Sequence, residues 1–170
     1  FPYDVVRQMG EMGLFGLPIS EEYGGMGGDY MALGVALEEL ARVDQSVAIT
    51  LEAGVSLGIM PIYRFGSDEQ KQTYLPNLVA GKNLAGFGLT EPEAGSDAGG
   101  TKTTAKLDGG EWVINGSKMW ITNGSVADVA IVWARTDLEE GSRGGRGFGV
   151  PTDTKGFRSM VVKHKLSLRA

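Results

Sequence analysis

Residues 89–100, with the sequence LTEPEAGSDAGG, gather groups that could bind a cofactor or an anion. Within twelve positions they include three carboxylates, a threonine, a serine and a glycine cluster. Gly95 and Ser96 are expected to form a turn whose N–H groups and hydroxyl suit a pyrophosphate contact. The nearby carboxylates would repel a bare phosphate, so a polar loop between two strands is the structural alternative.

The residues just before this loop predict a strand over 84–90 that ends at Thr90. Gly86 and Gly88 carry no side chain, so a flat group could lie against the strand there. Pro92 cannot donate to a β-ladder and should end the pairing.

A second candidate stretch, KMWITNG, covers residues 118–124. Trp120 and Thr122 are two positions apart, so on a strand they would face the same side. An indole beside a hydroxyl suits a flat heteroaromatic ring, because the indole packs on it and the hydroxyl bonds a ring nitrogen. The alternative for Trp120 is simple core packing. Trp112 and Trp133 are interpreted as core or interface aromatics.

Two other glycine-rich stretches are weaker candidates. Residues 23–29, YGGMGGD, lie between predicted helices, whereas a dinucleotide-binding loop follows a strand. Residues 141–147, GSRGGRG, hold two arginines that could bind phosphate, but a solvated hairpin tip is favoured.

The first half of the chain has the pattern of helices that would support these loops. Asp29 and Ser67 are expected N-caps, and Gln70 completes a capping box with Ser67. The helix after Asp29 is so apolar that burial on more than one side is predicted. Residues 45–66 repeat apolar positions at four-residue steps until Pro61, which is expected to interrupt the helix.

The second half changes to the two-residue period of strands. Asp108-Gly109-Gly110 and Asn115-Gly116 each predict a hairpin turn. Residues 126–136 form a continuous β-branched and aromatic run that favours a buried strand, and two more strands are predicted within 145–168. The expected fold is α+β: an N-terminal α-helical domain over residues 1–82, followed by a mainly antiparallel β-domain over 83–170.

Composition excludes several function classes. The net charge is −5 with both signs interspersed, which argues against a nucleic-acid groove. There is no cysteine, and His164 is the only histidine, so neither a thiolate nucleophile nor a metal site is expected. No run of about twenty uninterrupted apolar residues predicts a membrane span. The start lacks both a secretory pattern and an initiator methionine, so the chain is expected to begin inside a longer polypeptide.

The two candidate stretches together resemble one known family. LTEPEAGSD followed by NGSKMWITNG resembles the acyl-CoA dehydrogenase family, and three flanking stretches do so in the same order: LFGLPISEEYGGMGGDY, FGSDEQKQTYLPNLVAGK and GFGVPTDTKGF. The resemblance implies an N-terminal helical domain, a middle β-domain and a C-terminal helical bundle, the last of which is expected to be absent from this chain.

The resemblance also implies an FAD site. The residues that match its flavin contacts are Phe87, Gly88, Leu89, Thr90, Gly95, Ser96, Trp120, Ile121 and Thr122. By similarity, Thr90 bonds the ring near its N1/O2 edge, Thr122 lies near N5, and Ser96 also lies near the acyl-CoA substrate. The carboxylates of residues 89–100 are expected to organise the loop and not to react.

The implied activity is the oxidation of a saturated acyl-CoA to the trans-2-enoyl-CoA, a step of fatty-acid β-oxidation. The implied catalytic glutamate belongs to the C-terminal bundle, so no catalytic residue is assigned here and the isolated chain is expected to be inactive. Implied partners are an electron-transferring flavoprotein or equivalent and further copies in a homotetramer or homodimer. The implied location is the bacterial cytoplasm or the mitochondrial matrix.

Two alternatives remain open at this point. The same fold could serve a flavin monooxygenase or oxidase, although the retained TEPEAGSD stretch disfavours this. A truncated, non-catalytic relative could instead act as a binding module, although the intact flavin-contact residues disfavour that.

Overall fold

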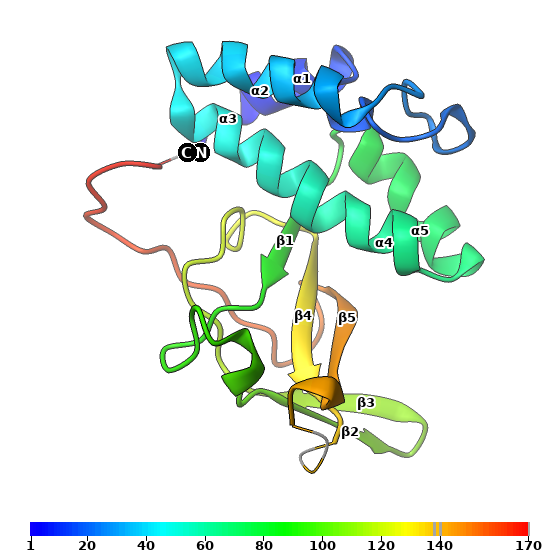
Figure 1. Cartoon of the computed structure of the whole chain (residues 1–170), viewed down its shortest axis with the longest axis vertical. Helices are drawn as coiled ribbons and strands as arrows, with labels where there is room; N and C mark the ends of the chain where they lie inside the picture. Colours follow the sequence, from blue (N-terminus) through cyan, green and yellow to red (C-terminus); the bar gives the residue numbers. More distant parts are fainter. Residues whose placement is uncertain (138, 140, 170) are drawn as a thin grey trace.

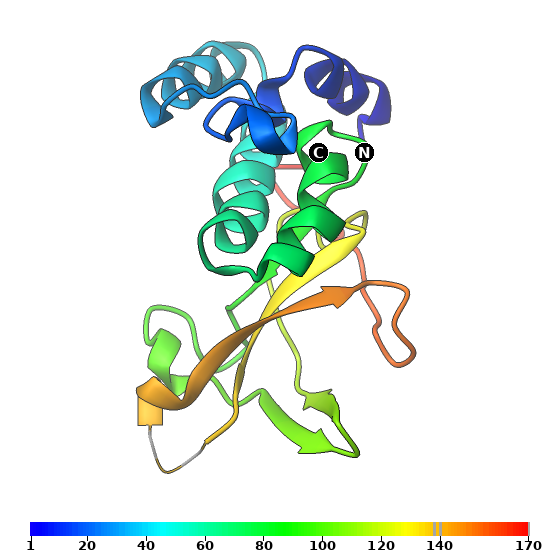
Figure 2. The same cartoon turned by 90° about the vertical axis from the view of Figure 1, so that its right-hand side faces the viewer.

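The computed structural model describes residues 1–137, 139 and 141–169. Helices form one half of the molecule and a twisted sheet forms the other, stacked along the long axis (Figures 1 and 2). The last described residues return to the helical half, where the Arg169 N–H donates to the Ser46 hydroxyl at 3.0 Å.

The helical half contains α1 to α5 and short 3₁₀ turns. The α-helices are α1 (Tyr3–Glu11), α2 (Tyr30–Val43), α3 (Gln45–Glu52), α4 (Met60–Phe65) and α5 (Asp68–Val79), and a π-helical stretch, η3 (Ala53–Ile59), joins α3 to α4. The predicted caps are confirmed. The Asp29 carboxylate accepts from the Ala32 N–H at 2.9 Å, and Ser67 and Gln70 form the reciprocal capping box.

The other half is a mixed five-stranded sheet. Its strands are β1 (Ala85–Gly88), β2 (Thr104–Asp108), β3 (Glu111–Asn115), β4 (Val129–Arg135) and β5 (Gly145–Pro151). Antiparallel pairing joins β2 to β3 and β4 to β5, whereas β1 is parallel to β4 and β2 meets β4 in parallel at one residue pair. The α+β fold is confirmed, with two parallel contacts that the sequence did not predict.

The helix α2 is less buried than its composition predicts. Only Leu33 of α2 is fully buried, whereas Met31, Val35 and Val43 are exposed. The helix lies at the outer side of the helical half and packs mainly on α3 (Figure 1). The prediction of burial on several sides is therefore wrong, because one helical neighbour covers only one stripe of α2.

Pro61 does not interrupt its helix, contrary to the prediction. One continuous helix runs over Gln45–Phe65, with Pro61 in the first turn of α4. In the π stretch immediately before it, the Met60 N–H donates to the Val55 carbonyl, and this wider turn moves the chain past the carbonyl that a proline ring would otherwise meet. This helix is long and apolar enough to cross a membrane, but 61% of its apolar window is buried inside the protein, as in a core helix.

The core joins the two halves across this helix. Val55 and Ile59 belong to the same buried cluster as Ala85 of β1 and Ile131 of β4. A methyl group on Gly58 would lie 2.4 Å from the Ala85 Cβ, so only glycine allows the helix to approach β1 this closely. The close contact between Gly58 and Ala85 therefore fixes the position of the first residue of β1 relative to the helix.

Two of the predicted β features are absent from the described residues. The Asp108-Gly109-Gly110 hairpin is confirmed, but no hairpin forms at Asn115-Gly116, where β3 simply ends. A methyl group on Gly116 would lie 2.1 Å from the Thr103 hydroxyl oxygen, so this glycine permits a close chain crossing and not a turn. The second strand predicted within 145–168 does not form either, since β5 ends at Pro151.

Candidate functional site

The two candidate stretches lie side by side at the end of β1. The Met119 N–H donates to the Thr90 carbonyl at 2.9 Å, and the Lys118 ammonium donates to the Leu89 carbonyl at 3.1 Å. A methyl group on Gly88 would lie 3.3 Å from the Lys118 Cγ, so the small residue admits the lysine stem. Residues 87–91 and 118–122 thus form one surface, although 27 positions separate Glu91 from Lys118.

Glu91 is the anchor of this surface. Its buried carboxylate accepts from the Lys102 N–H at 2.6 Å, the Thr103 N–H at 3.0 Å, the Thr103 hydroxyl and the Lys118 ammonium at 2.7 Å. The four donors come from the segment before β2 and the segment after β3. One side chain therefore holds three stretches of chain together.

The electrostatics of Glu91 follow from these donors. Burial raises the pKa of the Glu91 carboxyl, but the hydrogen bonds from Lys118, Thr103 and the two backbone N–H groups outweigh it and lower the pKa from 4.5 to about 2. Glu91 is therefore a structural group that is fully charged at neutral pH. The expectation that carboxylates organise this loop agrees with the geometry of Glu91.

Glu93 has a simpler role in the same loop. It forms an exposed ion pair with the Lys102 ammonium. Glu91 and Ala94, on either side of Pro92 and Glu93, exchange backbone hydrogen bonds of 2.9 and 3.2 Å, which closes a tight turn.

The structure places Trp120 and Thr122 differently from the prediction. Residues 116–122 are irregular, so the two side chains do not share the face of a strand. Trp120 has a φ of 61° and is 64% exposed, while Thr122 is half-buried. The positive φ breaks the alternation on which the prediction rested, because a strand requires φ near −120°.

The exposure of Trp120 argues against core packing within the described residues. An indole in a strained left-handed conformation and largely in solvent is not core packing. Neighbouring Ile121 is half-buried, with its side chain 3.5 Å from the place a methyl on Gly86 would occupy. The chain thus turns the indole outwards while it keeps the next residue against β1.

The remaining predicted residues occupy two environments. Phe87 is half-buried and contacts Trp133 edge-to-face, with ring centroids 6.1 Å apart. Gly88 is buried within β1, whereas Gly95 and Ser96 are exposed on the loop beyond Glu91. A methyl group on Gly95 would meet no atom within 4 Å, so this part of the loop is open.

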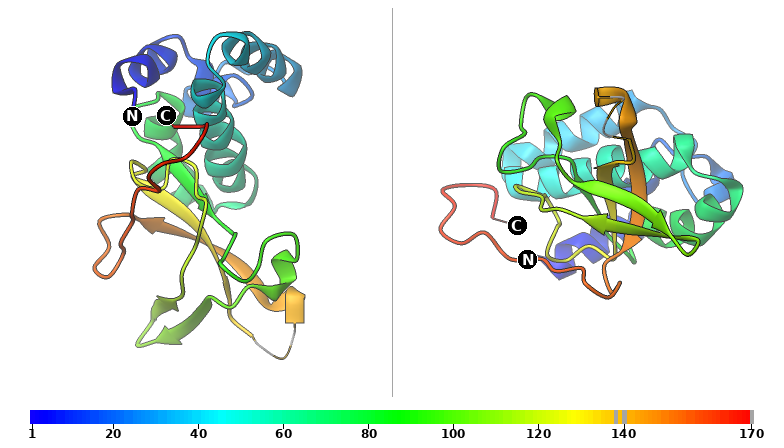
Figure 3. Two further views of the ribbon diagram at one scale, coloured as in Figure 1. Left: turned by 90° about the vertical axis from the view of Figure 1, so that its left-hand side faces the viewer. Right: turned by 90° about the horizontal axis from the view of Figure 1, so that it is seen from below.

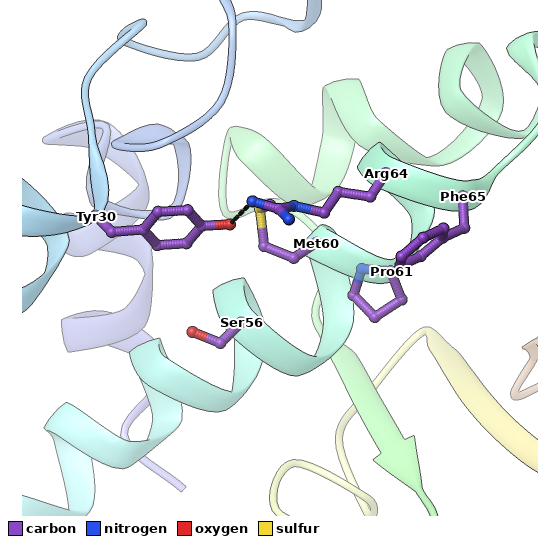
Figure 4. Close-up of a pocket in the computed structure, with 6 residues that line it drawn as sticks. All are labelled: Tyr30, Ser56, Met60, Pro61, Arg64 and Phe65. Carbon is purple, nitrogen blue, oxygen red and sulfur yellow. Dashed lines mark hydrogen bonds between the residues drawn. The ribbon is translucent and has the colours of Figure 1, made fainter.

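The two cavities found among the described residues lie elsewhere. One, of about 250 Å³, lies between the start of α2 and α4, where the Arg64 guanidinium donates to the Tyr30 hydroxyl at 2.9 Å (Figure 4). The other, of about 350 Å³, lies between α5 and the ends of β4 and β5 that are next to the helical half, where β4 begins and β5 ends. Neither is lined by a predicted site residue.

Sequence reasoning missed three residues that build this surface: Thr103, Lys118 and Asn123. Lys118 had a usable signal, because its charge is opposite to that of Glu91 and it belongs to the second candidate stretch. Thr103 and Asn123 make buried polar contacts with residues that are distant in the sequence, and no local sequence pattern predicts such contacts.

The residues present fit a flat, hydrogen-bonding ring system. Trp120 offers an indole that the fold holds away from the core. The hydroxyls of Thr90 and Thr122 take part in none of the hydrogen bonds that join the two segments. An apolar plane with hydroxyls near it is what an isoalloxazine ring requires.

Comparison with known proteins defines the family. The model for "Acyl-CoA dehydrogenase, N-terminal domain" matches residues 1–82, and the model for "Acyl-CoA dehydrogenase, middle domain" matches residues 86–170. The chain belongs to the acyl-CoA dehydrogenase family.

Individual relatives support this assignment. The chain is 48% identical to the probable acyl-CoA dehydrogenase YngJ of Bacillus subtilis, over 99% of the chain and 45% of that protein. It is 44% identical to the short-chain specific acyl-CoA dehydrogenase of Clostridium acetobutylicum, over 100% of the chain and 45% of that protein. The chain therefore spans less than half the length of these relatives.

A solved structure agrees with the fold. The glutaryl-CoA dehydrogenase of Mycobacterium smegmatis in complex with FADH2 superposes with a TM-score of 0.93 at 45% identity. The match covers 100% of this chain and 42% of the other.

Replacing Trp120 with glycine should separate stability from flavin binding. Glycine adopts a positive φ without strain and little buried area is lost, so the free energy of unfolding should stay equal or rise by about 1 kcal/mol. Loss of the indole plane should weaken FAD binding by about 1–3 kcal/mol. Denaturant unfolding and fluorescence titration with FAD measure the two effects. A large decrease in the free energy of unfolding would instead indicate that Trp120 has a structural role.

Proposed function

We propose that the polypeptide that contains this chain is an FAD-dependent acyl-CoA dehydrogenase. It oxidises the Cα–Cβ bond of a saturated acyl-CoA thioester to the trans-2-enoyl-CoA. The observation that carries the proposal is the outward-facing, strained Trp120 beside Thr122, held against the Thr90 segment by the Glu91 and Lys118 contacts.

Nine residues of this chain would hold the flavin: Phe87, Gly88, Leu89, Thr90, Gly95, Ser96, Trp120, Ile121 and Thr122. When bound, FAD supplies the acceptor for the hydride that leaves the substrate β-carbon, at ring position N5. The Thr90 hydroxyl would donate to the N1/O2 edge, where it stabilises the negative charge that develops on reduction. The Thr122 hydroxyl would bond near N5, and the Trp120 indole would pack on the ring.

Ser96 would also contact the acyl-CoA, since its loop projects from the surface that the flavin would occupy. The proton on the substrate α-carbon needs a base, and Glu91 does not fit this role. Its carboxylate already accepts four hydrogen bonds, and with a pKa of about 2 it binds a proton too weakly. By resemblance to the family, whose base belongs to the C-terminal bundle, we propose that the base is a residue outside these 170.

Partners and location follow the family. The reduced flavin would pass its electrons to an electron-transferring flavoprotein or an equivalent acceptor. The polypeptide would form a homotetramer or homodimer in the bacterial cytoplasm or the mitochondrial matrix. Residues 1–82 and 83–170 would act as its helical domain and its β-domain.

An anaerobic absorption titration tests the proposal. The natural polypeptide that contains these residues is loaded with FAD and mixed with saturated acyl-CoAs of different chain lengths. Bleaching of the flavin band without oxygen supports dehydrogenation. A yellow protein that does not bleach contradicts it and favours the oxidase or monooxygenase alternative, and a protein that takes up no FAD favours the binding module.

Replacing Thr122 with valine should slow flavin reduction. Valine keeps the size of the threonine side chain but removes the hydroxyl expected near N5, so an interaction made during hydride transfer is lost. We expect a tenfold or greater decrease in the reduction rate, measured by anaerobic stopped-flow absorption. Ser125→Ala, which removes an exposed hydroxyl three residues away, is the matched control. An unchanged rate for Thr122→Val would contradict the placement near N5.

A further inference from the structure

Asn123 directly follows Thr122 and is buried in the described structure. Its side-chain Nδ2 donates to the Thr50 carbonyl at 3.3 Å and to the Ala85 carbonyl at 3.4 Å. Its φ of 62° is left-handed, a conformation that asparagine adopts more readily than most residues. The side chain therefore bridges the irregular site segment, the long helix and the first residue of β1.

The orientation of this amide follows from its surroundings. Both nearby partners are carbonyl oxygens, which only accept, so the NH₂ group must face them. The other amide atom, Oδ1, is buried and has no partner within the described part of the chain. The side-chain hydrogen bonds of Asn123 are thus made by Nδ2, to Thr50 and Ala85, and not by Oδ1.

The helix carbonyl that Asn123 contacts lies where the helix changes register. Thr50 is in the last turn of α3, and its carbonyl also receives the Ala53 N–H at the first residue of the π stretch. The amide thus contacts the helix where the π stretch begins. The same stretch contains Gly58, which packs closely against Ala85 of β1. The loop before β4 lies beside the start of β1, below this helix, both in Figure 1 and in the view turned by 90° about the vertical axis (Figure 3, left).

The turn itself does not need the asparagine side chain. The Asn123 backbone carbonyl accepts from the Val126 and Ala127 N–H groups at 2.9 and 2.8 Å, and any residue that tolerates a positive φ makes those bonds. Glycine at this position would form the same turn. What only the amide supplies is the attachment to Thr50 and Ala85.

We propose that Asn123 is a positioning residue, whose amide fixes residues 118–122 against the long helix and β1 and so sets the direction of Thr122 and Trp120. The inference about the flavin contacts rests on the proposed function, whereas the attachment of the segment does not. Two left-handed residues, Trp120 and Asn123, flank Ile121 and Thr122. The second is buried and attached, and the first is free to face outwards.

Asn123→Gly tests this, because it keeps the left-handed turn and removes the amide. We expect hydrogen-exchange protection of the Met119 N–H, which donates to Thr90, to fall at least tenfold. Protection of the β4 amides that pair with β5 should stay unchanged, and Ser125→Ala should change neither. Unchanged protection at Met119, or an equal loss in both places, would overturn the proposal, since the latter reports only global destabilisation.

Two further measurements keep the result decisive. In the holoenzyme, Asn123→Gly should raise the FAD dissociation constant about tenfold. If the unaltered protein takes up no FAD, the proposed function fails while the exchange result still decides the role of Asn123. If Asn123→Gly does not fold, NMR of the unaltered protein decides: slowly exchanging Asn123 side-chain amide protons support the attachment, and exchange at the rate of a free amide overturns it.

Discussion

Replacing Lys118 with methionine is expected to lower the free energy of unfolding by about 3–5 kcal/mol. Methionine preserves the length of the side chain that packs over Gly88 but removes the charge. The buried Glu91 carboxylate then loses its cationic partner, and an unpaired buried charge costs far more than an ion pair contributes. Urea unfolding followed by circular dichroism measures the loss. The Lys118 and Glu91 side chains are only 11% and 6% exposed, so water cannot replace the interaction.

The chain contains its own control for this result. Lys102 also pairs with a glutamate of the same loop, Glu93, but these side chains are 71% and 65% exposed. Lys102→Met should therefore cost less than about 1 kcal/mol, because solvent screens an exposed pair. Equal losses for the two variants would show that burial does not govern the Glu91 pair.

Acid should remove the Glu91 contribution over a defined pH range. The pKa of Glu91 is about 2 in the folded protein. It is 4.5 for a glutamate without these contacts, as in the unfolded chain, so the unfolded chain binds the proton more readily. The stabilisation is fully present above pH 4.5 and is lost as the pH falls towards 2. A shift of this size corresponds to about 3 kcal/mol, with stability rising by about 1 kcal/mol per pH unit near pH 3.

The comparison with Glu91→Gln isolates this effect from other carboxylates. Glutamine does not titrate, so the variant should be less stable at pH 6 and should show a shallower dependence on pH between 2 and 4.5. The difference between the two curves, taken from urea unfolding at each pH, is the measured quantity. Parallel curves would contradict the low pKa of Glu91.

Features set by neighbouring residues were predictable from the sequence. Asp29, and Ser67 with Gln70, cap helices through contacts within three residues, and the hairpin at Gly109 and Gly110 depends on two positions. That the two candidate stretches contribute to one site was implied only by the resemblance to a flavoprotein family, not by a local pattern in either stretch.

Features set by distant residues were not predictable. Gly116 resembles a turn residue, but it is needed because Thr103 crosses there. The left-handed φ of Trp120 follows from tertiary contacts on both sides of it, so the two-residue period gave the wrong direction for the indole. The exposed face of α2 likewise depends on how many helices surround it, which composition does not show.

The π stretch between α3 and α4 has a consequence for the tolerance of this helix to insertions and deletions. An α-helix turns by about 100° per residue, so the wider turns of Ala53–Ile59 shift the phase of everything after them. With this phase Gly58 faces Ala85, and Arg64 reaches Tyr30 on α2. Regular α geometry with the same number of residues would rotate Arg64 away by about 100°, whereas deleting one residue would let a regular α-helix keep the present phase. The number of residues in this stretch and its π geometry are therefore coupled: changing one without the other moves Gly58 away from Ala85 or Arg64 away from Tyr30.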